Sequence, residues 1–111
     1  MATELKGVLL NVEKNTVEIK VVDGSLDEFF EALNCGYVEV FTRLIGGRSF
    51  YIVCDEALNQ WEDEPLIYGN LFIAGIGEDE DLASLSEQDC DHVIAYIKPD
   101  GYRLHSTMEK E

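Results

Sequence analysis

Four consecutive acidic residues form the densest group of side chains that could bind a cation in this chain: Glu78, Asp79, Glu80 and Asp81. Carboxylate oxygens are the ligands that hard ions such as Ca²⁺ prefer. The run lacks the D-x-D-x-D-G spacing and the terminal Glu of an EF-hand loop. The sequence therefore favours a solvated acidic turn. A metal-binding protein or a small metal-dependent enzyme that uses this loop stays as an alternative.

A thiol, a carboxylate and an imidazole follow one another at Cys90, Asp91 and His92. On a helix, residues one and two positions apart point in different directions, so these groups cannot form a nucleophile–base pair. The other histidine, His105, lies near the C-terminus, and no histidine has metal-ligand spacing. No glycine-rich turn has the spacing of a phosphate-binding loop. The favoured interpretation is a protein that is not an enzyme, with no catalytic residue, metal or cofactor.

The charge balance is the strongest compositional signal, with 8 Lys and Arg against 23 Asp and Glu and a net charge of -15. Twelve of the acidic residues lie between Asp55 and Asp91, and no Lys or Arg occurs between Arg48 and Lys98. A surface this negative repels nucleic acid phosphates and anionic membranes. The sequence therefore predicts no direct nucleic-acid or membrane binding, and it favours another protein as the partner.

The acidic residues are also numerous enough to imitate DNA. Twelve carboxylates on one face of a domain of this size would reach roughly 60% of the charge density of a duplex. A DNA mimic that inhibits a DNA-binding enzyme is therefore a second alternative, which requires that these residues share one face. The acidic candidates for a contact surface are Glu62, Asp63, Glu64, Glu78, Asp79, Glu80, Asp81, Glu87 and Asp91.

The elements that position these residues form one domain, 1–101, followed by a short C-terminal tail, 102–111. Strands are predicted at 5–12, 16–22, 37–45, 48–54 and 66–76. In 16–22 apolar and charged residues alternate, which predicts a half-buried strand with Val17, Ile19 and Val21 on the covered face.

Two helices are predicted, each introduced by a capping serine. Ser25 is followed by Glu28 in a capping-box pattern, and Ser86 has Asp89 at the corresponding position. Gly36 is expected in the left-handed position that ends the first helix. The predicted fold class is α+β, with about five mostly antiparallel strands and the two short helices on one face.

Gly46-Gly47 predicts a tight hairpin that places Phe41 opposite Ile52, with apolar residues on both faces. Either another element covers the second face or it is a surface for self-association, so a homodimer through this hairpin is one candidate assembly. Phe41, Ile52 and Trp61 are the apolar candidates for a contact surface. The ring of Trp61 is expected either to anchor a partner or to fold onto the sheet.

Three cysteines, Cys35, Cys54 and Cys90, form an odd set without a CxxC pair. Each lies in an apolar pattern, which is typical of a reduced, buried thiol. The residues before the first strand leave no room for a secretory signal, and no apolar run is long enough to span a membrane. The sequence therefore predicts a cytoplasmic protein.

The order of these elements resembles a family of small domains of unknown function from phages and mobile elements of Firmicutes and related bacteria. The segments that carry the resemblance are Asp23-Gly24-Ser25-Leu26, Gly36-Tyr37-Val38-Glu39, Val53-Cys54-Asp55-Glu56, Gly69-Asn70-Leu71-Phe72-Ile73 and Leu85-Ser86-Glu87. Asp55-Glu56 is followed here by Ala57, where the family tends to have glycine. The resemblance implies a non-enzymatic accessory role in a bacterial or phage cytoplasm. An acidic interaction or regulatory protein is accordingly the favoured function.

Overall fold

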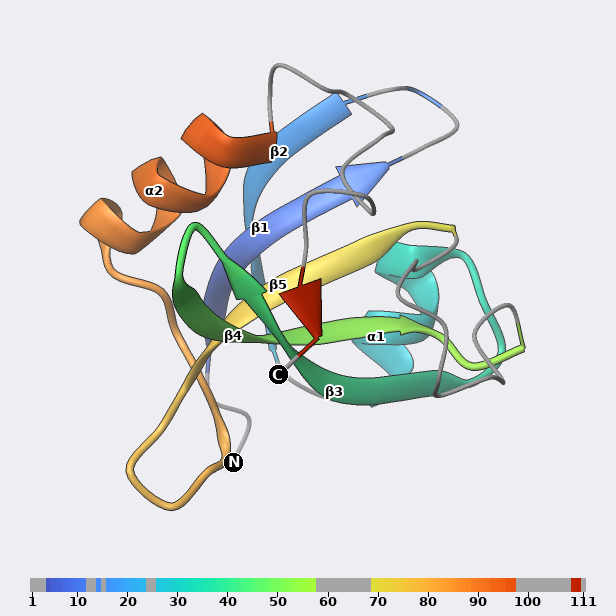
Figure 1. Ribbon diagram of the computed structural model, residues 1–111. Coiled ribbons are helices and arrows are strands. Elements are labelled where there is room, and N and C mark those ends of the chain that lie inside the picture. Colours follow the sequence, from blue (N-terminus) through green and yellow to red (C-terminus); the bar gives the residue numbers. More distant parts are fainter. Residues whose placement is uncertain are drawn as a thin grey trace.

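The computed structural model of this protein describes residues 4–11, 14, 16–23, 26–57, 69–97 and 109–110. Their strands form an antiparallel sheet in the order β2-β1-β5-β4-β3-β7, and β6 pairs with β5 beside this row (Figure 1). With the two helices, this confirms the predicted α+β class. The elements are β1 (Leu5–Asn11), β2 (Thr16–Val22), α1 (Leu26–Leu33), β3 (Val38–Ile45), β4 (Arg48–Asp55), β5 (Leu71–Ile76), β6 (Leu82–Ala83), α2 (Glu87–Ile97) and β7 (Glu109–Lys110).

Some sequence predictions fall outside the described residues. They concern Trp61 and the acidic residues 62–64, the cap Ser25, the first part of the strand predicted at 66–76, and most of the tail 102–111. Within the described part of that strand, β5 begins at Leu71, after a bend at Gly69. None of the described helices has the length and apolar character needed to cross a membrane.

The two helices cover opposite faces of the sheet, so the prediction that both lie on one face is wrong. Phe29 and Leu33 of α1 belong to a buried cluster with Leu9, Val53, Phe72 and Ala74. Cys90 and Val93 of α2 belong to a second cluster with Val8, Leu10, Ile52 and Ile73. Successive side chains of a strand point to opposite faces, and the central strands are apolar at nearly every position. Both faces therefore need a covering helix.

The β3–β4 hairpin has the predicted register, with Val40 opposite Val53 and Phe41 opposite Ile52. Gly46 and Gly47 make its turn at positive φ, 61° and 81°, as a two-residue turn requires. Gly46 also lies under α2, where a Cβ atom would overlap the ring of Tyr96. The turn that was a candidate surface for self-association is thus in contact with a helix of its own chain.

The two helix ends that can be checked differ in outcome. The hydroxyl of Ser86 accepts a hydrogen bond from the backbone N–H of Asp89 (3.1 Å), which confirms the predicted cap of α2. The left-handed residue after α1 is Asn34 (φ 54°) rather than Gly36. The N–H of Cys35 bonds the carbonyl of Phe30, and the N–H of Asn34 bonds that of Glu31, which is a Schellman motif centred on asparagine.

Candidate interaction site

The acidic run Glu78–Asp81 lies in the loop between β5 and β6, and all four residues are exposed. The loop is closed by two backbone hydrogen bonds, from Gly77 N–H to the carbonyl of Asp81 (2.7 Å) and from Glu80 N–H to the carbonyl of Gly77 (3.0 Å). The hydroxyl of Tyr51 donates a third bond to the carbonyl of Glu80. These contacts give the loop a defined shape.

The carboxylate of Asp81 folds back over Gly77 at the start of this loop. A Cβ atom at that position would overlap Oδ1 of Asp81. At the base of the loop Ile76 pairs with Leu82, and the Ile76 side chain remains 38% exposed. The loop thus combines four carboxylates with an apolar side chain at its foot.

The loop carboxylates have no cationic partner among the residues that the structure describes. Arg48 pairs instead with Asp89 of α2, and the guanidinium of Arg43 lies over the ring of Phe41 at 4.2 Å. No group of three His, Cys, Asp or Glu side chains in the described part of the chain is arranged to hold a metal ion. The described residues therefore leave the loop charges facing solvent.

The other acidic candidates lie elsewhere on the molecule. Glu87 and Asp91 are exposed on α2, which covers the opposite face from Tyr51. Asp55 is the last residue of β4, which ends next to the start of β5. The acidic loop follows the end of β5, so the end of β4 and the acidic loop lie at opposite ends of these strands (Figure 1). Within the described residues, the carboxylates do not form one elongated face, and this arrangement does not favour a DNA mimic.

Of the two apolar candidates in the hairpin, neither forms an open contact surface. Ile52 has no exposed area and lies within the core beneath α2, so it cannot contact a partner in the folded chain. The expectation that it lies on a contact surface is therefore wrong. Phe41 is half-buried, packs against the same core and is covered on one side by Arg43.

The thiols and the imidazole have structural environments. Burial raises the pKa of the Cys54 thiol to about 12, with the charge of Glu39 as a further cause, and burial also raises the pKa of Cys90. Both thiols therefore stay protonated near neutral pH and are poor nucleophiles. His92 lies 2.9 Å from the carbonyl of Ile45, so its Nε2 carries the proton and donates to it. Its role is to attach α2 to the hairpin turn.

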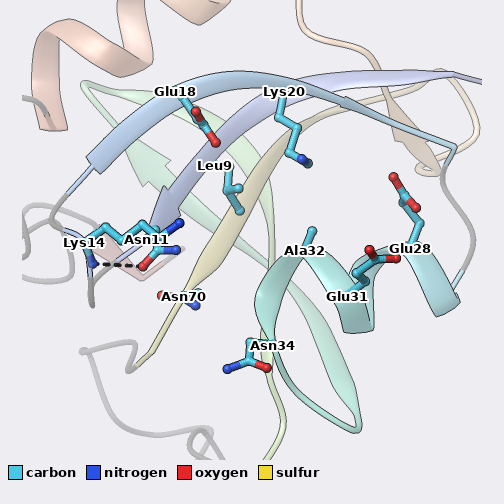
Figure 2. Close-up of a pocket in the computed structure, with 10 residues that line it drawn as sticks. All are labelled: Leu9, Asn11, Lys14, Glu18, Lys20, Glu28, Glu31, Ala32, Asn34 and Asn70. Carbon is cyan, nitrogen blue, oxygen red and sulfur yellow. Dashed lines mark hydrogen bonds between the residues drawn. The ribbon is translucent and has the colours of Figure 1, made fainter.

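A groove of about 430 Å³ lies between α1 and the strands β1 and β2 (Figure 2). Its walls carry both signs of charge: Glu18 and Lys20 project from β2, and Glu28 and Glu31 from α1, over a floor that includes Leu9. Lys14 and three asparagines line the remainder. Such a lining suits charged groups of both signs rather than an apolar ligand.

Strand β2 is the outermost strand on this side of the sheet, and it pairs with β1 alone among the described strands. Ile19 and Val21 were predicted on a covered face, but they are 46% and 50% exposed. Val17, which packs against the core next to α2, is partly buried. The three residues share one face as predicted, but Ile19 and Val21 remain exposed on the edge strand.

No family model matches the chain, and no curated protein or solved structure matches it either. The family resemblance inferred from the sequence therefore stays a prediction, and function rests on the surfaces described above.

Proposed function

We propose that this protein is a non-catalytic, cytoplasmic binding protein whose acidic β5–β6 loop contacts a positively charged surface of another protein. The observation that supports this most is the combination of order and charge in the loop. Three hydrogen bonds hold its backbone, while Glu78, Asp79, Glu80 and Asp81 project into solvent without a described cationic partner. A shaped loop of this kind loses little conformational entropy on binding.

The net charge of -15 adds a long-range component. A strongly negative molecule attracts basic surfaces during diffusional encounter, and the effect weakens as salt screens it. The exposed part of the Ile76 side chain at the base of the loop offers apolar area that the contact can bury. The shape of the loop then determines specificity, and the net negative charge of the whole chain increases the rate of association.

The buried groups support a role without covalent chemistry. Cys54 and Cys90 are kept protonated by burial, and His92 is bonded to a backbone carbonyl. All three cysteines are free thiols, which supports a reducing compartment.

The test is capture of the partner from a lysate of the source cells by immobilised protein, at low and at high salt. The loop variant E78Q/D79N/E80Q/D81N should lose the specific partner. The control E4Q/D27N/E31Q/E56Q removes the same number of exposed charges elsewhere and should retain it. A partner kept by the loop variant, or lost equally by both variants, would contradict the assignment of the site.

A further inference from the structure

The outer edge of β2 has the properties of a strand that can still accept a neighbour. It runs for seven residues in unbroken register with β1, from Thr16 opposite Asn11 to Val22 opposite Leu5. It contains neither proline nor a bulge, two of the devices that block edge-to-edge pairing, and its charged residues Glu18 and Lys20 have opposite signs. Its outermost apolar side chains, Ile19 and Val21, are about half exposed. Pairing with another strand would cover them.

We propose that this chain forms a symmetric dimer in which β2 pairs antiparallel with β2 of a second copy, about a two-fold axis at Ile19. This proposal is independent of the acidic loop. It rests on the self-complementary charge pattern of the strand. In this register Glu18 lies opposite Lys20 of the second copy and Lys20 opposite its Glu18, while Ile19 faces itself and Val17 faces Val21.

The neighbouring registers are disfavoured by the same residues. Side chains that lie opposite one another across two strands must point to the same face, so the register can change only in steps of two residues. A two-fold axis at Glu18 would place Glu18 opposite Glu18, and an axis at Lys20 would place Lys20 opposite Lys20. Like charges directly opposite are destabilising, whereas opposite charges stabilise the pair. Among these three registers only the one centred on Ile19 avoids both repulsions, and it is the register that places Glu18 opposite Lys20.

The two faces of the edge also match in this arrangement. A two-fold axis perpendicular to the sheet puts α1 of both copies on one side and α2 of both copies on the other. Glu18 and Lys20 project from β2 into the mixed-charge groove on the α1 side, as Figure 2 shows. In the dimer the oppositely charged residue of the second copy comes next to each of them. On the α2 side the exposed apolar residues Ile19 and Val21 gain apolar neighbours.

The overall charge opposes association, since each copy carries -15. Salt screens this repulsion, so the dimer should strengthen as the ionic strength rises. Sedimentation equilibrium over a range of protein concentrations and salt concentrations measures the dissociation constant. A chain that stays monomeric at all accessible concentrations would refute the proposal.

Charge exchange tests the register. Glu18→Lys alone places two pairs of lysines opposite each other, and Lys20→Glu alone places two pairs of glutamates. Each single variant should raise the dissociation constant by about tenfold or more. The double variant E18K/K20E restores two opposite-charge pairs and should restore dimerisation. Glu56→Lys, an exposed residue after β4, makes the same charge change as E18K and should not weaken the dimer. Dimerisation that is unaffected by either single exchange, or not rescued in the double variant, would place the interface elsewhere, such as at the hairpin turn.

Cysteine cross-linking gives an independent measure of the same register. Residues directly opposite in an antiparallel pair have Cα atoms about 4.5–5.5 Å apart, which a disulfide can bridge. Ile19→Cys should therefore form a covalent dimer on mild oxidation. Thr16→Cys is the matched control, because each Thr16 lies opposite Val22 and the two copies of residue 16 are about 20 Å apart. Equal cross-linking of the two variants would contradict the register.

Discussion

The hydroxyl of Tyr51 is predicted to maintain the shape of the acidic loop, and Tyr51→Phe removes that hydroxyl alone. The Tyr51 ring packs against the core on the α1 side and should stay in place. The variant loses one neutral hydrogen bond, from the hydroxyl to the carbonyl of Glu80, at an exposed site where water can replace it. A bond of this kind contributes about 0.5–1.5 kcal/mol to the free energy of unfolding.

The expected loss is measurable by urea denaturation. With a denaturant dependence of about 1–3 kcal/mol/M, the variant's midpoint should fall by about 0.2–1.5 M. Hydrogen exchange at the amides of Gly77 and Glu80 should accelerate by several-fold, because both N–H groups close the loop. Capture of a basic partner should weaken although the charge is unchanged, which separates the role of loop shape from that of charge.

Tyr37→Phe is the control, since the Tyr37 side chain is 71% exposed. It should leave the urea midpoint and the exchange of both loop amides at wild-type values. Wild-type values of the midpoint and of amide exchange in Tyr51→Phe would show that the hydroxyl does not maintain the loop, and the role assigned to it would be wrong.

Two further predictions concern the core and the end of α1. Asn34→Gly should increase the free energy of unfolding by about 0.5–1 kcal/mol, and Asn34→Ala should decrease it by about 1 kcal/mol, because residue 34 has φ 54°. Equal urea midpoints for the two variants would contradict this. The pKa of Cys54 is raised from 9.0 to about 12 in the folded state, so the unfolded chain releases this proton first and stability should fall as pH rises from 9 towards 12. Relative to Cys54→Ala, wild type should lose about 1.4 kcal/mol of unfolding free energy per pH unit in this range, and parallel pH profiles of the two proteins would refute the assignment.

Short sequence patterns predicted the helices and strands well where one or two residues determine the local backbone conformation. Gly46-Gly47 permits a two-residue turn, and that turn alone sets the whole register of β3 and β4. Ser86 likewise predicted the start of α2. The end of α1 was predicted wrongly because asparagine also tolerates the left-handed conformation. Asn34 precedes Gly36 in the chain and is the left-handed residue that ends the helix.

The surfaces depend on which strands become neighbours, and local patterns do not carry that information. The β1–β2 hairpin was readable from the sequence, but its position at the edge follows from the pairing of β1 with the distant β5. The exposure of Ile19 and Val21 is a consequence of this long-range pairing. The contact of Tyr51 with Glu80 joins residues 29 positions apart for the same reason. The apolar residues on both faces of the β3–β4 hairpin left open whether another element or a second copy covers its second face, and the two helices were wrongly expected on one face.

Photo-crosslinking from the acidic loop tests the central proposal most directly. A photoreactive amino acid is placed at position 79 in one sample and at position 27, an exposed acidic site on α1, in the other. Both proteins are irradiated in a lysate of the source cells, and the products are identified by mass spectrometry. The proposed function predicts a discrete adduct with a basic protein from position 79, which is absent from position 27 and lost at high salt. The same adducts from both positions, or none from position 79, would contradict the loop as the contact site.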